Sequence, residues 1–202
     1  MKITSIRQQI KRSDRYSVYV NGKYDFSLSA HELLASKLKI NQALTDTELD
    51  ELKDKAIIDK GYDRVLNLII RRVRSEWEMR DYLKRKDYSI NQIEKILNML
   101  SKNGYVNDED FARRWIENRR LLKSTSKRRL TQELRQKRVA DEIIQQVLEA
   151  DATDEQQVLR ELIERKRQQT RYQNDLKLMQ YLVRQGYTYG YIKAVLDELG
   201  SV

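Results

Sequence analysis

The sequence contains no cysteine and no proline, and it has only one histidine, His31, among its 202 residues. Without cysteine the chain forms no disulfide and offers no thiolate, which fits a reducing compartment, so we expect a cytoplasmic protein. A single histidine without neighbouring ligands predicts no metal site, and the six glycines form no phosphate-binding loop. We therefore expect no catalytic residues, no metal and no cofactor, and we do not expect an enzyme.

Long hydrophobic runs are missing as well. The N-terminus lacks the apolar core of a signal peptide, and no stretch approaches the ~20 apolar residues of a membrane span, so we expect no membrane contact. Charge is abundant, because Asp, Glu, Lys and Arg make up 35% of the residues and the formal net charge is +9. The composition alone predicts an acidic partner, which leaves nucleic acid, an anionic membrane or an acidic protein.

Three stretches of the chain repeat the same apolar pattern. Apolar residues stand at offsets of 4, 9, 14, 17 and 18 from Met79, and the same offsets recur from Leu130 and from Leu178. In each copy the first two positions have the i, i+4 spacing of a helix, the third lies in a turn, and the last three lie on a second helix. Spacings of 51 and 48 residues between copies are typical of tandem helical repeats.

The N-terminal residues follow a different period. Residues 3–28 alternate with a period of two, and Asn21-Gly22 predicts a tight hairpin because both residues tolerate a positive φ. We predict a three-stranded meander, which is small enough to need a helix to cover it. A capping box at Ser29 predicts a helix that runs through Leu38.

Further capping boxes predict where helices begin. They are Thr45 with Glu48, Ser75 with Glu78, Ser89 with Gln92, and Thr153 with Gln156. The helix that begins after Thr45 is expected to end near Lys60, and the first repeat is expected to start near Gly61. An alternative is that this helix bridges into the repeats. The predicted fold is mainly α: three tandem three-helix repeats preceded by a small N-terminal β-meander with helices. The predicted domains are residues 1–60, 61–105, 106–151 and 152–202.

Positive charge is concentrated in residues 113–138, which contain eleven basic residues and only two acidic ones, Glu117 and Glu133. A field of one sign attracts polyanions, and the loop Ser124–Ser126 within this window is expected to donate hydrogen bonds to phosphate. The competing interpretation is an interface with an acidic protein surface. The candidate contacts in this window are Arg113, Arg114, Arg119, Arg120, Lys123, Lys127, Arg128, Arg129, Arg135, Lys137 and Arg138.

Three stretches carry a resemblance to a known family. They read Arg72-x-Arg74-Ser75-Glu76-x-Glu78-Met79-x-x-x-Leu83-x-x-Lys86, then Gly104-Tyr105-Val106-Asn107-Asp108-x-x-Phe111-Ala112, then Lys127-x-x-Leu130-x-x-Glu133-Leu134-x-x-Lys137-x-Val139. Together they resemble the RecX family of recombination regulators, over nearly the whole chain. Arg138 stands where the family usually has a Gly. The resemblance adds Arg72, Arg74 and Lys86 to the candidate contacts.

The resemblance implies a cytoplasmic bacterial protein of tandem three-helix units, with a part in homologous recombination, DNA repair and the SOS response. Such a protein would bind the RecA recombinase filament on single-stranded or duplex DNA and modulate it, by inhibiting its ATPase and strand exchange. We expect it to act as a monomer. Two alternatives stay open, a stand-alone DNA-binding protein with helix-turn-helix-like units and a helical-repeat adaptor for another protein.

We predict that the central cations contribute more to partner binding than the cluster Arg165–Arg167. Because their field is of one sign, alanine variants at six central positions should weaken recombinase–DNA binding more than alanine variants of that cluster. Co-sedimentation of both sets tests this, and equal losses would argue against a focused site. The six positions are Arg113, Arg119, Arg120, Lys127, Arg128 and Arg135.

Overall fold

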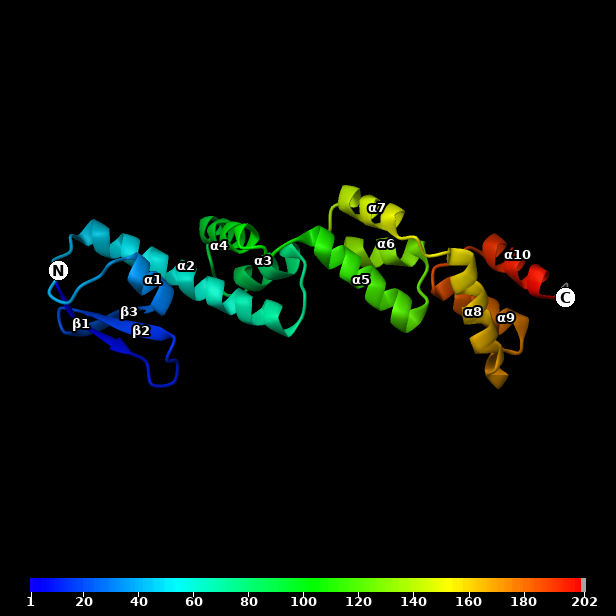
Figure 1. The fold of residues 1–202 in the computed structure, drawn as a ribbon, viewed down its shortest axis with the longest axis horizontal. Coiled ribbons are helices and arrows are strands. Elements are labelled where there is room, and N and C mark those ends of the chain that lie inside the picture. The colour runs from blue at the N-terminus through cyan, green and yellow to red at the C-terminus, as the bar shows by residue number, and fades with distance from the viewer. Residues whose placement is uncertain (201–202) are drawn as a thin grey trace. The chain divides into compact units, whose positions relative to one another are not determined.

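The computed structural model describes residues 1–200 and divides the chain into two compact units, Met1–Val106 and Asn107–Val202. The first unit contains β1 (Ile3–Gln8), β2 (Arg15–Val20), β3 (Lys23–Ser29), α1 (Ala30–Ala35), α2 (Asp46–Arg71), α3 (Glu76–Lys84) and α4 (Ile90–Lys102) (Figure 1). The second contains α5 (Asp108–Lys123), α6 (Lys127–Gln136), α7 (Asp141–Ala150), α8 (Glu155–Arg167), the 3-10 turn η1 (Thr170–Tyr172), α9 (Asp175–Arg184) and α10 (Tyr189–Gly200). The predicted fold class, mainly α with three-helix repeats and a small N-terminal sheet, is confirmed.

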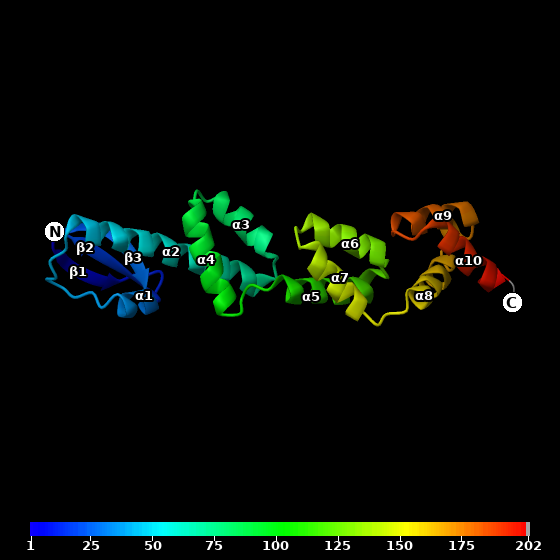
Figure 2. The same cartoon turned by 90° about the horizontal axis from the view of Figure 1, so that it is seen from above.

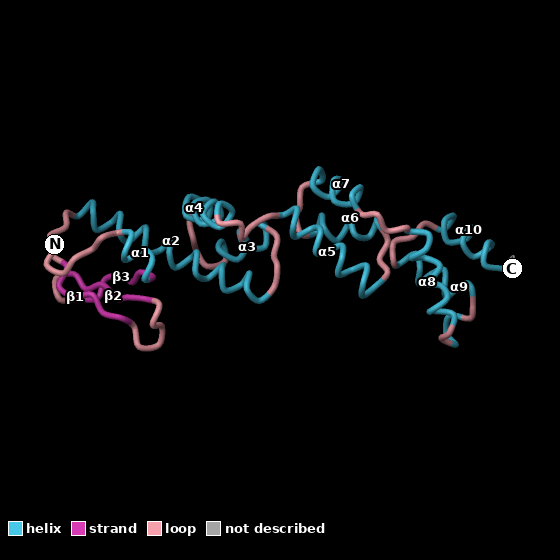
Figure 3. The backbone as a smooth tube through the Cα atoms, in the orientation of Figure 1, coloured by secondary structure: helices cyan, strands magenta, loops and turns pink. Residues whose placement is uncertain are grey.

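The three strands form an antiparallel meander in the order β1-β2-β3, and they are the strands drawn in magenta in Figure 3. Asn21 and Gly22 form the predicted hairpin turn, with φ of 49° and 81°, and Val20 pairs with Lys23 across it. One face of the sheet is covered by the N-terminal half of α2, which supplies Leu49 and other apolar side chains to a shared core. That cover provides the apolar contact that a three-stranded sheet lacks on its own.

Helix α2 is one continuous helix of 26 residues, so the predicted helix boundary near Gly61 is wrong, and the alternative of a helix that bridges into the repeats is confirmed. Its first half packs on the sheet, and its second half, through Val65, joins the core of the first three-helix repeat with α3 and α4. The predicted domain boundary between residues 60 and 61 therefore falls inside this helix. A Cβ on Gly61 would lie 2.8 Å from Tyr88 Cε1 and nearer still to the Ile96 methyl group. The glycine marks a close approach between helices and not a helix start.

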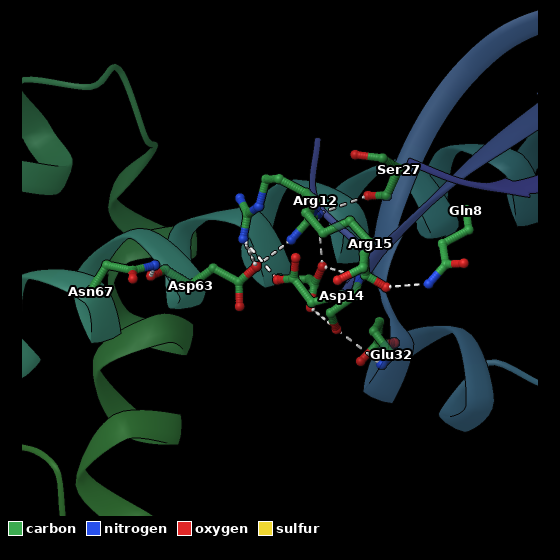
Figure 4. A network of polar contacts seen from close by, with 11 residues as sticks. Gln8, Arg12, Asp14, Arg15, Ser27, Glu32, Asp63 and Asn67 are labelled. Carbon is green, nitrogen blue, oxygen red and sulfur yellow. Dashed lines mark hydrogen bonds and ion pairs between the residues drawn. The ribbon is translucent and has the colours of Figure 1, made fainter. Parts of the chain in front are cut away.

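A buried ion-pair network fixes the sheet to α2. Arg15 is 2% exposed, and its Nη2 lies 2.9 Å from Asp59 Oδ2, while its Nη1 pairs with Asp63. The guanidinium also donates to the Ser27 carbonyl, at 3.0 Å (Figure 4). Burial raises the pKa of Asp63, although the Arg15 charge acts to lower it. The charge of Arg15 is thus what keeps two largely buried carboxylates compatible with the fold.

All three repeats bury the predicted apolar positions. Of the eighteen residues in the pattern, Leu148 and Leu196 are half-buried and the others are buried. In each copy the second and third helices are joined by the same turn, in which one residue has a positive φ: Asp87 (62°), Arg138 (58°) or Gly186 (96°). The next backbone N–H then donates to a carbonyl five residues back, as from Val139 to Leu134 at 3.2 Å, which ends the second helix.

The capping boxes at Thr45, Ser75 and Ser89 begin α2, α3 and α4 as predicted. Two local predictions are wrong. The helix that begins after Ser29 ends at Ala35, because Lys37 has a φ of 50°. The N-cap residue of α8 is Asp154, whose side chain accepts hydrogen bonds from the backbone N–H groups of Gln156 and Gln157. Thr153 does not cap that helix, because its hydroxyl donates to Asp151 instead.

We predict that Gly61→Ala destabilises the protein by about 1–3 kcal/mol, because the added methyl group overpacks the contact with Tyr88 and Ile96. Helix propensity alone predicts the opposite, a gain of about 1 kcal/mol. Gly190→Ala in α10 is the matched control, since nothing lies within 4 Å of a Cβ there, and it should not destabilise. Urea unfolding followed by circular dichroism measures both changes. Equal gains from the two variants would contradict the close-approach role of Gly61.

Candidate functional site

The basic window folds as most of α5, a short loop, α6 and the turn that follows it. Asn107 begins α5, because its Oδ1 accepts hydrogen bonds from the backbone N–H groups of Glu109 and Asp110. Ser126 begins α6 by accepting from the N–H of Arg129 at 3.2 Å. Both helices belong to the second repeat, so the structure places all eleven cations of the window on one three-helix domain.

Three exposed cations of the window pair with carboxylates that lie outside it in the sequence. The pairs are Arg113 with Glu109 at 2.6 Å, Arg114 with Asp110 at 3.0 Å, and Arg135 with Asp141 at 2.7 Å. All three arginine side chains are more than half exposed. Exposed pairs of this kind contribute less than about 1 kcal/mol, so a phosphate group can replace the carboxylate at little cost.

A second group of cations is ordered around Trp115 and Glu133. The Trp115 indole N–H donates to Glu133 Oε2 at 3.0 Å, and the Nε of Arg119 donates to the same oxygen at 2.7 Å. The guanidinium of Arg119 lies 4.7 Å from the centre of the indole ring, and the ammonium of Lys137 lies 5.4 Å from it. Arg129 reaches the other oxygen of Glu133 at 3.4 Å. These contacts hold α5 against α6, so the three cations have a structural role in the repeat.

Arg120 is a structural residue of the second unit. Its side chain is 10% exposed, lies 2.9 Å from Asp151 Oδ2, and donates to the Thr125 carbonyl at 2.6 Å. Burial acts to raise the pKa of Asp151, but hydrogen bonds from Thr153 and Arg120 outweigh it and hold that pKa below its usual value. A guanidinium engaged in this way is not available to a partner.

The loop Ser124–Ser126 and the start of α6 contact the third repeat, and we name this set of contacts the repeat junction. Helix N- and C-termini meet there, because α6 begins where α9 ends. The contacts are Ser126 Oγ to the Gln185 carbonyl at 3.0 Å, Arg129 to the Arg184 carbonyl, the Lys127 N–H to Glu155 at 2.7 Å, Arg165 to Ser124 Oγ at 3.1 Å, and Tyr187 Oη to the Ser124 carbonyl at 3.1 Å.

Gly186 and Tyr187 set the geometry of the repeat junction. Gly186 has a φ of 96°, and a Cβ there would lie 2.8 Å from Arg129 Cβ, so only glycine permits this approach. Burial, and then the nearby Glu155 carboxylate, raise the pKa of Tyr187. Its hydroxyl therefore stays protonated and keeps donating to Ser124.

The prediction that Ser124–Ser126 donate to phosphate is wrong for Thr125 and Ser126. Thr125 and Ser126 are each 1% exposed, and the Ser126 hydroxyl donates to Gln185 while it caps α6. Ser124 has a φ of 48° at the end of α5, and its hydroxyl accepts from Arg165. The loop is polar because it joins two repeats, and a single sequence cannot distinguish that role from anion binding.

Four cations of the window have side chains that form no ion pair with any described residue: Lys123, Lys127, Arg128 and Arg138. Three of them are exposed and Lys127 is half-buried. Arg128 lies on the outer face of α6, two helical turns from Arg135, and Arg138 lies in the turn after that helix. This face of α6, together with the readily released pairs of Arg113 and Arg114, is the candidate anion-binding surface.

The three remaining candidates lie in the first unit. Arg72 forms a double hydrogen bond with Glu78, at 3.2 and 2.9 Å, beside the start of α3. Arg74 donates to the Leu68 carbonyl, and burial together with the neighbouring Arg72 charge lowers its pKa. Lys86 is exposed in the turn after α3. Of the three, Lys86 is thus the one most open to a partner.

No local pattern in the sequence predicts the residues that form these long-range contacts. Asp151, which pairs with Arg120, lies in the connection before α8, and Glu155, which accepts from the Lys127 backbone N–H, is the first residue of α8. The backbone carbonyls of Arg184 and Gln185 accept from Arg129 and Ser126. Gly186 was the one visible signal, since a glycine before an inward tyrosine marks a backbone that needs a positive φ.

Family models match three segments of the chain. They are described as "Regulatory protein RecX N-terminal domain" for residues 1–45, "RecX, first three-helix domain" for residues 62–100, and "RecX, second three-helix domain" for residues 107–148. The regulatory protein RecX of Listeria monocytogenes serotype 4a (strain HCC23) is 34% identical over 209 residues, which cover 100% of this chain and 77% of the relative.

The chain belongs to the RecX family.

Another RecX-family relative, the regulatory protein RecX of Bacillus subtilis (strain 168), is 26% identical over 98% of this chain and 76% of its own length. The fold is similar to two solved RecX structures, each 23% identical to this chain. One, a crystal structure of regulatory protein RecX, has a TM-score of 0.74 over 97% of this chain and 98% of its own. The other, RecX from Lactobacillus salivarius, has a TM-score of 0.63 over 75% and 99%.

Residues 1–200 contain neither a candidate metal site nor a candidate membrane span. In that part of the chain no three His, Asp or Glu side chains are grouped so as to hold a metal ion. None of its helices combines the length and the apolar character needed to cross a bilayer. The candidate functional site is the arginine- and lysine-bearing surface of the second repeat.

We predict opposite outcomes for two arginines eight residues apart. Arg120→Ala should lower the free energy of unfolding by about 2 kcal/mol, because it leaves Asp151 largely buried without its cation. Arg128→Ala should change that free energy by less than about 0.5 kcal/mol, because its side chain is exposed and unpaired. Urea unfolding and amide hydrogen exchange of the second unit measure both. A large loss of stability from Arg128→Ala would contradict the assignment of Arg128 to a free surface.

Proposed function

We propose that this RecX-family protein is a non-enzymatic regulator that binds the RecA recombinase filament on DNA and inhibits its ATPase and strand exchange. It acts in the cytoplasm as a monomer and needs no metal or cofactor. Family membership supports the regulatory role, since the relatives are named regulatory protein RecX. The observation that carries the contact with a polyanionic filament is the set of unpaired cations on and beside α6, at Lys123, Lys127, Arg128 and Arg138.

The chemistry of these cations suits DNA in a filament. Lysine and arginine that neutralise phosphates release condensed counterions, so binding weakens steeply with salt. Contacts to phosphate position a protein without reading sequence, which suits a regulator that must act wherever a filament forms. Arg113 and Arg114 add to the surface when they exchange an exposed carboxylate for a phosphate.

A second function is favoured by the same cationic face. A stand-alone DNA-binding protein would also place cations on a helix of a three-helix unit, and it would bind naked DNA tightly without recombinase. An adaptor for another protein differs from both, because reversing the charges of Arg128 and Arg138, which form no ion pair with a described residue, would leave its association with DNA unchanged.

The ATPase of the recombinase on single-stranded DNA tests the proposal. Saturating wild-type protein should lower the ATPase rate, and Arg128→Glu with Arg138→Glu should raise the concentration needed for half inhibition at least about tenfold, because it puts two repulsive charges on the surface. Lys60→Glu with Lys193→Glu is the matched control, with the same change of net charge at exposed lysines elsewhere, and should inhibit like wild type. An ATPase rate that does not respond to saturating wild-type protein would contradict the proposed function.

A further inference from the structure

The second helix of each repeat begins at an equivalent N-cap residue, which is Ser75, Ser126 or Asn174. The copies are therefore in register, and their outward positions can be compared one by one. On and after α6 these positions hold Arg128, Thr131, Arg135 and Asp141, and on and after α9 they hold Leu176, Met179, Val183 and Tyr189. A polar and cationic face in one repeat is an apolar face in the next.

The fold does not require these apolar residues. Leu178 and Leu182 are the buried core positions of α9, both 0% exposed, whereas Leu176 is 65%, Val183 48% and Tyr189 62% exposed. Met179 reaches the edge of the core and is half-buried. The second repeat carries polar side chains at the same positions and still buries its core, so the fold tolerates polar residues there. Along the α9 face runs an open groove of about 840 Å³, with Gln180 and Arg184 beside the apolar residues.

The end of α9 lies beside the start of α6. The repeat junction joins the first turn of α6 to the end of α9, through Ser126 to the Gln185 carbonyl at 3.0 Å and Arg129 to the Arg184 carbonyl. Figure 2 shows α6 and α9 following one another along the same side of the second unit. A partner that lies along α6 therefore meets α9 next.

We propose that the outer face of α9 is a docking surface for an apolar patch on the protein component of a protein–DNA filament, beside the nucleic acid contacted by α6. This inference rests on the proposed function and adds the protein contact to it. Surfaces that contact nucleic acid are strongly cationic, whereas the four outward positions on and after α9 hold no cation, and among the described residues Arg184 is the one cation that lines the groove beside them. Contiguous exposed apolar side chains with a polar rim mark protein interaction sites.

Two variants test the docking surface. Leu176→Ser with Val183→Ser removes its apolar character, and Leu176→Arg with Val183→Arg installs the residues that α6 carries at the same positions, where the fold accepts them. Binding is measured to a recombinase filament on single-stranded DNA by co-sedimentation, and to the same DNA alone by fluorescence anisotropy. Both variants should bind the filament at least about tenfold more weakly, and the serine variant should bind naked DNA within about twofold of wild type.

The matched control replaces equally exposed apolar residues elsewhere. Ile10 is 102% and Leu34 77% exposed, so Ile10→Ser with Leu34→Ser should bind the filament like wild type. Unchanged filament binding by both α9 variants overturns the inference and leaves the proposed function standing. An equal loss of binding to naked DNA by the serine variant also overturns the inference. The same holds if wild-type protein is a dimer in sedimentation velocity and the serine variant is a monomer. If wild-type protein binds no filament at all, the proposed function fails and the docking surface falls with it.

Discussion

Burial of the same inward positions in each repeat, closed by a left-handed turn between the second and third helices, is the constraint on which the rest of the structure depends. The turn needs one residue with a positive φ and two hydrogen bonds to the end of the preceding helix, and Asp87, Arg138 and Gly186 all satisfy it. Because the frame is complete within each repeat, the outward positions of the second helix are free to change. These positions are polar in the second repeat, where two of them are arginines, and apolar in the third repeat.

Local signals in the sequence predicted local structure well. The hairpin at Asn21-Gly22, the capping boxes at Ser75 and Ser89 and the repeated apolar positions all depend on residues a few positions apart. The helix boundary predicted at Gly61 was wrong, because a glycine that allows a neighbouring helix to pack closely cannot be told in sequence from a glycine that ends a helix. Nothing in the linear pattern distinguishes these two roles.

The candidate site was harder to predict, because charge in sequence is not charge in space. The window 113–138 contains only two acidic residues, yet carboxylates from outside it, including Asp141 and Asp151, form ion pairs with its arginines. Arg120 and Arg129 became structural through partners 31 and 55 residues away. Such contacts are set by how the second and third repeats pack, which no periodicity encodes. The remaining candidate is a smaller cationic face around Arg128, on a helix whose first turn contacts the end of α9.

Site-specific photo-crosslinking tests the central claim, that neighbouring helices touch different components of one filament. A benzophenone amino acid would replace Arg128 in one protein and Val183 in another, and each would be irradiated while bound to a recombinase filament on single-stranded DNA. The account predicts that the group at position 128 crosslinks to the DNA strand and the group at position 183 to the recombinase. Crosslinks from both positions to the same component, or from neither, would contradict it.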